Sequence, residues 1–155
     1  MQRKSFEDME CPIARSLEHV GEWWSILILR DAFGGLTRFD EFQKSLGIAP
    51  TMLTRRLAAL VDAGLLERRL YQERPPRHEY VLTQRGYDFQ PVLLTLFAWG
   101  RKHFAAPGYD KVLADTETGA LVEPVLVDAK TGAPLDAPAM IVNPRTEEPG
   151  SRAAS

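Results

Sequence analysis

Residues 50–86 combine a short helical pattern with two strand patterns and a stiff turn, and this order constrains the fold more than any other part of the chain. The first part, PTMLTRRLAALVDAGLLERRL, has apolar residues at helical spacing. The second part, YQERPPRHEYVLTQRG, alternates apolar and polar residues on both sides of Arg74-Pro75-Pro76-Arg77. A helix followed directly by a two-stranded hairpin with a basic tip predicts a winged helix.

The helix expected from Pro50 has two faces of different chemistry. With successive residues about 100° apart, Leu53 and Leu57 point into the protein, whereas Thr51 and Arg55 point outward. Short side chains around one central arginine allow close approach to a DNA groove, where arginine can bind guanine edges or phosphates. The pattern therefore predicts that this helix reads DNA and that the hairpin, or wing, holds the neighbouring backbone.

Two helices are expected before this unit. One covers residues 11–21, with Pro12 in its opening turn and Gly21 at its end. The next, EWWSILILRDAF, is apolar nearly all round, which predicts a buried helix that stops at Gly34-Gly35.

Capping patterns mark two further helices, one on each side of the unit. Thr37 is expected to be the N-cap of the earlier helix, with Asp40 completing a capping box and Gly47 ending the helix. After the hairpin, Thr83 is expected to cap one long last helix to residue 104, with a kink at Pro91.

The chain changes character after residue 106, because VLADTETGALVEP and VLVDAKTGAPLDA are two copies of one 13-residue pattern. Each copy is expected to form a strand, a Thr-Gly turn and a strand, and AMIV at 139–142 is a candidate for one more strand. So short a meander is only marginally stable alone and should pack against the main domain or a partner. The sequence thus predicts a domain at 1–106, a β-rich extension at 107–142 and a disordered tail at 143–155.

The composition fits a globular protein in a reducing compartment. Apolar residues make up 45% of the 155-residue chain, and the N-terminus lacks the apolar stretch of a secretory signal. No apolar run approaches the ~20 residues of a membrane span. The single cysteine excludes an internal disulfide and favours the cytoplasm.

The net charge of −2 argues mildly against a nucleic-acid partner, but the charge is unevenly distributed. Residues 1–104 hold 15 Lys and Arg against 13 Asp and Glu, a net +2, whereas residues 105–155 hold 4 against 8, a net −4. Local basic patches, rather than the net charge, determine phosphate contacts.

Short motifs between Cys11 and His103 together resemble the HxlR family of bacterial transcriptional regulators. In chain order they are Cys11-Pro12, Trp24, Arg38-Phe39, Glu41-Phe42, Met52-Leu53-Thr54, Leu57, Gly64-Leu65, Pro75-Pro76, Tyr80, Leu82-Thr83 and Gly86. Each motif is weak alone, but the set at these spacings is specific. Two positions depart from the family pattern: Ala49 replaces the usual Ser cap, and His78 replaces an apolar residue.

The resemblance implies an α+β, mainly α, winged helix-turn-helix protein that binds double-stranded DNA as a homodimer. Its first and last helices, within residues 11–104, would build the dimer, and the helix from Pro50 would read DNA. Some family members sense electrophiles, quinones or hypochlorite through the cysteine that corresponds to Cys11. We therefore expect a sequence-specific transcriptional regulator, a repressor, with a small C-terminal β meander.

The predicted DNA contacts are six residues of the helix and the wing: Thr51, Thr54, Arg55, Arg56, Arg74 and Arg77. Arg56 lies beside the buried face, so an ion pair within the protein is as plausible for it as a phosphate contact. The threonines can donate to phosphates from the first turn, although Thr51 can equally act in local capping. In the wing, Arg68 and Arg69 alternate faces, so at most one faces DNA and the other should pair with a carboxylate.

Cys11 is the candidate sensor of an oxidant or electrophile. A thiol at the start of a helix can favour the thiolate, because the helix end carries partial positive charge. The alternative is a small residue buried in the dimer interface. With no second cysteine, sensing needs a Cys11–Cys11 bridge between subunits, a mixed disulfide or alkylation.

Aromatic residues offer a second route to a small-molecule effector. Trp23, Trp24 and Trp99 are candidates to line an effector pocket near the dimer helices. Core packing explains Trp24 and Trp99 better, and Trp23 is open to either interpretation.

Two other classes of function remain as alternatives. The stronger is a protein-interaction module, in which the winged helix no longer reads DNA and the acidic repeat docks a partner. An enzyme is the weaker alternative, because His19, His78 and His103 have no metal-ligand spacing and Cys11 has no His or acid at a recognisable distance. We therefore expect no catalysis, no cofactor and no metal.

Overall fold

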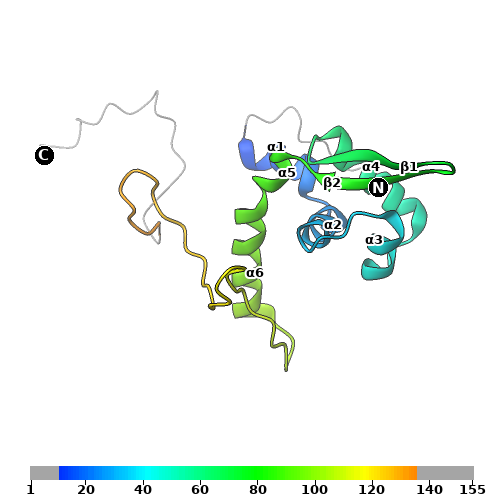
Figure 1. The fold of residues 1–155 in the computed structure, drawn as a ribbon. Coiled ribbons are helices and arrows are strands. Elements are labelled where there is room, and N and C mark those ends of the chain that lie inside the picture. The colour runs from blue at the N-terminus through cyan, green and yellow to red at the C-terminus, as the bar shows by residue number, and fades with distance from the viewer. Residues whose placement is uncertain (1–10, 136–155) are drawn as a thin grey trace, which may run out of the picture. The chain divides into compact units, whose positions relative to one another are not determined.

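The computed structural model describes residues 11–135 and divides the chain into two compact units, with the boundary in the chain between His103 and Phe104. The first unit holds all the regular elements, apart from the last residue of its final helix (Figure 1). In chain order they are α1 (Pro12–Val20), α2 (Trp23–Phe33), α3 (Phe39–Leu46), α4 (Pro50–Asp62), β1 (Leu66–Glu73), β2 (Pro76–Leu82), α5 (Gln84–Tyr87) and α6 (Gln90–Phe104). The predicted winged helix is confirmed, with α3 and α4 as the helix-turn-helix pair and β1–β2 as the wing.

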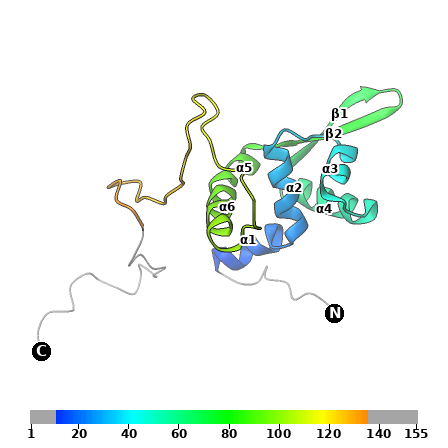
Figure 2. The ribbon, with the colours of Figure 1, turned by 90° about the horizontal axis from the view of Figure 1, so that it is seen from below.

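The wing is an antiparallel hairpin that projects away from the helices (Figure 2). Leu66 pairs with Leu82 at its base and Glu73 pairs with Pro76 at its tip, so Arg74 and Pro75 form the turn. The register shifts between Leu70 and Gln72, which leaves one extra residue on β1.

A short segment before α3 joins the hairpin as a further edge. Arg38 forms a bridge with Glu79, and the backbone N–H of Tyr80 donates to the carbonyl of Thr37 at 2.7 Å. The start of α3 is therefore fixed directly to the second strand of the wing.

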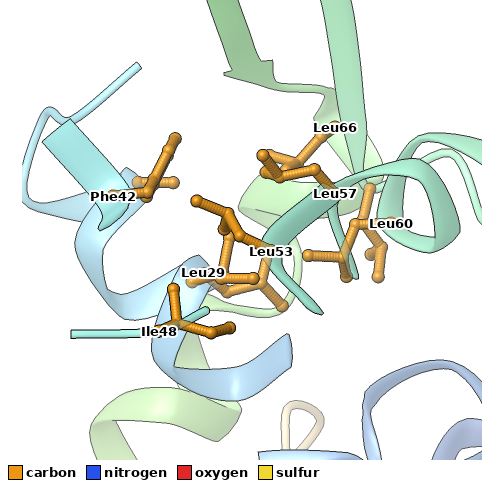
Figure 3. Packing of buried hydrophobic residues seen from close by; sticks show 10 residues of the cluster. Leu29, Phe42, Ile48, Leu53, Leu57, Leu60 and Leu66 are labelled. Carbon is orange, nitrogen blue, oxygen red and sulfur yellow. The ribbon is translucent and has the colours of Figure 1, made fainter. Parts of the chain in front are cut away.

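The core of the first unit lies between α2, α3, α4 and the base of the wing (Figure 3). Leu53, Leu57 and Leu60 line the inner face of α4, and each is fully buried. Burying a leucine contributes about 1.5–3 kcal/mol relative to leaving it exposed, so these three side chains fix the rotation of α4. The remaining core residues are Ile28, Leu29, Ala32, Phe42, Ile48, Leu65 and Leu66.

The first helices end largely as the sequence predicts. Pro12 opens α1 and Gly21 caps its end, while α2 stops at Gly34. Gly47 adopts the left-handed conformation (φ 61°) after α3, where a residue without Cβ carries no steric penalty.

The start of α3 differs from the prediction. Arg38, not Thr37, is the N-cap, and Glu41 takes the place expected for Asp40. The Glu41 carboxylate accepts the backbone N–H groups of Arg38 at 2.9 Å and Thr37 at 3.0 Å. The pairing of Thr37 with the wing holds that residue in the sheet edge, so the helix begins one position later than expected.

The expected long last helix is two helices. Thr83 caps α5 as predicted, its hydroxyl accepting the backbone N–H of Gly86 at 3.1 Å. The chain then breaks at Asp88-Phe89, and Pro91 lies in the first turn of α6, where a missing N–H costs no helical hydrogen bond. Gly86 is required here, because a Cβ would collide with the carbonyl oxygen of Leu65.

The second unit contains the two sequence repeats as two similar hairpin-like loops. Single bridges join Ala114 to Leu121 and Val127 to Pro134, and no longer strand forms among its described residues, 104–135. Asp115 accepts N–H groups from Glu117 and Thr118, and Asp128 fills the equivalent position in the second loop. The expected strand at 139–142 and the tail at 143–155 lie outside the described residues.

These bonds lower the pKa of Asp115, mainly through the N–H and hydroxyl of Thr118, and that of Asp128, mainly through the N–H of Lys130. Both repeats thus use one aspartate to close the turn. The two copies therefore resemble each other in structure as well as in sequence.

Replacing Glu41 with Gln should lower the melting temperature at neutral pH. The N–H groups of Arg38 and Thr37 hold the pKa of the Glu41 carboxyl below its usual value. A lowered folded-state pKa gives stability that is present above the unfolded-state pKa and is lost as pH falls through the folded-state pKa. The difference in melting temperature between wild type and Glu41→Gln should therefore shrink as the solution is acidified below the ordinary Glu range.

Asp40→Asn is the matched control, because this neighbouring carboxylate accepts none of these bonds among the described residues. Its melting curve should stay close to that of the wild type across the same pH range. An equal loss of stability in both variants would show that general charge at the helix start, rather than the Glu41 cap, is responsible.

Candidate nucleic-acid interface

The outer face of α4 is exposed and carries the residues predicted to meet DNA. Thr51, Thr54 and Arg55 all lie on it, together with the small side chains Ala58 and Ala59. The Thr54 hydroxyl donates to the carbonyl oxygen of Pro50 at 2.9 Å, so it must turn away from the helix before it can donate to a phosphate.

The first turn of α4 carries no side-chain cap. Pro50 occupies the opening position and Ala49 precedes it, so no side chain accepts the first N–H groups. Free N–H groups and the positive end of the helix dipole favour an anion at this point. The departure of Ala49 from the family pattern thus leaves donors available to an incoming phosphate.

Arg56 is held inside the protein. One terminal guanidinium nitrogen lies 3.3 Å from a carboxylate oxygen of Glu22, the residue that precedes α2, and only 22% of the Arg56 side chain is exposed. Its Nε is buried and has no partner among the described residues. The ion pair joins α4 to α2, and the DNA contact predicted for Arg56 stays a prediction.

The adjacent arginines of β1 have different partners. Arg69 bonds to Glu67 at 3.0 Å, which raises the pKa of its guanidinium through that hydrogen bond, and so it is the arginine that pairs with a carboxylate. Arg68 lies 3.1 Å from Nδ1 of His78 on the other strand. An arginine can only donate, so Nδ1 of His78 is the acceptor in this contact.

The end of the wing presents Arg74 and Arg77, both exposed. The Gln72 side-chain amide donates to the carbonyls of Arg74 and Pro75 at 3.2 Å each, which ties down the turn. The structure therefore brings both predicted wing arginines to the same end of the hairpin.

Sequence reasoning missed Arg38, whose guanidinium carbon lies 4.7 Å from the centre of the Tyr71 ring. In the sequence, Arg38 stood out only as part of the Arg38-Phe39 motif. That motif does not indicate that Tyr71 is its partner. The contact depends on the bridge between Arg38 and β2, a pairing between distant parts of the sequence.

Helices α1 and α6 contain no buried residue. An open cavity of about 720 Å³ lies between them, α5 and the end of α4, lined in part by Ile13, Leu17, Val92 and Leu96. None of the three tryptophans lines it.

The tryptophans themselves are divided between core and surface. Trp24 packs against the core as predicted. The core prediction for Trp99 is wrong, because 54% of its surface is exposed on α6, and Trp23 is 74% exposed.

Cys11 is a free, exposed thiol directly before α1. Within the described residues no His, Cys, Asp and Glu side chains gather into a possible metal site. None of the helices there has the length and apolar character needed to cross a bilayer.

The arrangement of α3, α4 and the wing agrees with a match of residues 19–107 to the model of the HxlR-like helix-turn-helix family. This chain belongs to the HxlR-like helix-turn-helix family. The assignment agrees with the prediction of a regulator rather than an enzyme.

Proteins similar in sequence to this chain are described as helix-turn-helix transcriptional regulators. Two regulators, Rv3095 of Mycobacterium tuberculosis and Mb3122 of Mycobacterium bovis, are each 43% identical over 95 residues. Both are uncharacterised HTH-type transcriptional regulators, and the match covers 61% of this chain but only 60% of theirs.

Solved structures extend the similarity beyond the winged helix. PA1607, described as a candidate transcription factor, matches with a TM-score of 0.81 and 41% identity over 91% of this chain and 99% of its own. That coverage runs past residue 107, where the family match ends, and so includes part of the repeat extension. The redox regulator HypR, solved in its reduced form, matches with a TM-score of 0.57 and 31% identity over 59% of this chain and 92% of its own.

Proposed function

We propose that this protein is a sequence-specific DNA-binding transcriptional regulator that acts as a homodimer in the cytoplasm. The single observation that carries the proposal is the exposed outer face of α4, with Arg55 at its centre and small side chains around it. A helix of this profile can enter the major groove while the wing arginines hold the neighbouring backbone. Membership of the HxlR-like helix-turn-helix family supports the same function.

The dimer is proposed to form through α1 and α6. These helices bury no residue in the single chain, and Ile13, Leu17, Val92 and Leu96 stay partly exposed around their shared cavity. A second copy of the same surface would remove these apolar side chains from water. It would also place two copies of α4 on successive major grooves of a pseudo-palindromic operator.

Repression is the proposed mode of regulation, released by a small molecule or an oxidant. The cavity beside α1 and α6 touches Asp62 and Ala63 at the end of α4. A ligand that altered this region would act on the reading helix and on the dimer helices together. The alternative, a protein-interaction module, makes the reading helix dispensable and assigns the docking surface to the repeat extension.

Arg55→Ala should weaken binding to DNA taken from upstream of the protein's own gene by about ten- to a hundredfold, the effect of losing one arginine contact to a base. Fluorescence anisotropy at two salt concentrations would measure it. Binding of the wild type should also fall steeply with salt, because its arginines displace counterions from the phosphates.

Arg69→Ala is the matched control, since its guanidinium already bonds to Glu67 on the same strand. It should retain close to wild-type affinity. Two results together would favour the interaction module and contradict the proposal. They are full regulatory activity of Arg55→Ala, and binding of a protein partner by residues 108–142 alone.

Cys11 is the proposed redox switch. The thiol is exposed at the start of α1, one of the helices proposed to form the dimer. Similarity to the redox regulator HypR, solved in a reduced and an oxidised form, supports a redox response. Two Cys11 thiols from different subunits can form one disulfide, giving two electrons and two protons to an oxidant.

Diamide should release the wild-type protein from its DNA and leave Cys11→Ser bound. Diamide accepts the two electrons and two protons and becomes the hydrazine, while the new disulfide changes the geometry of the dimer. Anisotropy with and without diamide, followed by non-reducing electrophoresis, would measure release and cross-linking together. Equal release of both proteins would eliminate the thiol switch.

A further inference from the structure

A hollow of about 340 Å³ lies between the first turn of α3 and the wing, apart from the outer face of α4. Its walls come from two distant stretches of sequence, one at the start of α3 and the other on both strands of the hairpin. The lining residues are Arg38, Phe39, Asp40, Tyr71, Arg77 and His78.

Arg38 is exposed, and its guanidinium lies over the ring of Tyr71. The guanidinium carbon lies 4.7 Å from the centre of the Tyr71 ring, within the range of a cation–π contact. The backbone of Arg38 is fixed as well, by its bridge to Glu79 on β2. Because both its backbone and its guanidinium are already positioned, Arg38 loses less side-chain entropy when it binds an anion.

The hollow has a positive balance of charge. Neither Arg38 nor Arg77 forms an ion pair within residues 11–135, whereas the neighbouring Arg69 is paired with Glu67. Asp40 is the one carboxylate in the lining, against two guanidinium groups. The Glu41 carboxylate lies outside the lining but interacts with the charge of Arg38, so it offsets part of the positive balance. The balance fits a singly charged anion.

We propose that this hollow binds one phosphate group of the DNA backbone, with Arg38 and Arg77 as its cationic ligands. Tyr71 is a positioning residue that holds the Arg38 guanidinium over the site. The proposal rests on the proposed DNA-binding function and adds Arg38, at the start of α3, to the contacts predicted for α4 and the wing.

The geometry of a duplex supports this position. One sugar-phosphate backbone separates the major groove, which would receive α4, from the minor groove beside it, which would receive the wing. The first turn of α3 is joined to the wing through the bridge between Arg38 and Glu79. A backbone that runs between the two grooves would therefore meet a positive hollow between the start of α3 and the outer half of the wing.

Salt dependence separates a phosphate contact from a structural role. The probe is a fluorescein-labelled duplex of mixed sequence, about 30 base pairs or three helical turns long. Arg38→Ala should reduce the slope of log K against log salt by about 0.9 for each bound subunit, and lower affinity near 0.1 M salt roughly tenfold. Because phosphates carry no sequence information, the loss should be the same on several duplexes of different sequence.

Tyr71 is tested through its coupling to Arg38. Tyr71→Ala should lose part of the affinity, and the double variant Arg38→Ala/Tyr71→Ala should bind no more weakly than Arg38→Ala alone. Tyr71→Phe keeps the aromatic face and should bind as the wild type does. Arg77→Ala, at an exposed position, gives an independent reduction of the slope if Arg38→Ala fails to fold.

Arg69→Ala is the control of equal charge on the same hairpin, and its slope should stay at the wild-type value. Binding by the wild type with an unchanged slope in both Arg38→Ala and Arg77→Ala would overturn this site and leave the DNA-binding function intact. An equal reduction of the slope in Arg69→Ala would also overturn it, because net charge alone would explain the effect. If the wild type bound none of the duplexes, the proposed DNA-binding function itself would be contradicted.

Discussion

The packing of α4 against the core determines which of its side chains face solvent. Leu53, Leu57 and Leu60 are fully buried, and in a helix their spacing leaves only one orientation for the residues between them. Arg55 must therefore point to solvent. The buried leucines thus determine which residues of α4 are exposed. A rotation of α4 by one residue would remove both the leucines from the core and Arg55 from the outer face.

The second constraint is the strand β2, which pairs with β1 on one side and with Arg38 on the other. It links the wing to the start of α3, while a short turn at residues 63–65 joins α4 to β1. The elements proposed to contact DNA are thus tied to one another by backbone pairing and by the core. The repeat extension forms a separate unit whose two loops are each closed by an aspartate.

The sequence was sufficient where a local pattern determined the structure, and insufficient where distant residues decided it. The faces of α4, the hairpin and the ends of α1 and α2 follow from periodicity and from proline and glycine positions. The α3 cap was misplaced because pairing with β2 holds Thr37 in the sheet edge. Helical spacing made an internal ion pair plausible for Arg56, but its partner Glu22 is far away in the sequence. The same is true of Arg38 and Tyr71, so no spacing rule could identify either partner.

Hydroxyl-radical footprinting on DNA from upstream of the protein's own gene would show whether α4 and the wing of two subunits bind one operator. We expect protection on one face of the duplex at two half-sites, about one helical turn apart. Backbone flanking each half-site should be protected by the wing. A single protected half-site, or no protection at any concentration that gives a shift in anisotropy, would contradict this mode of binding.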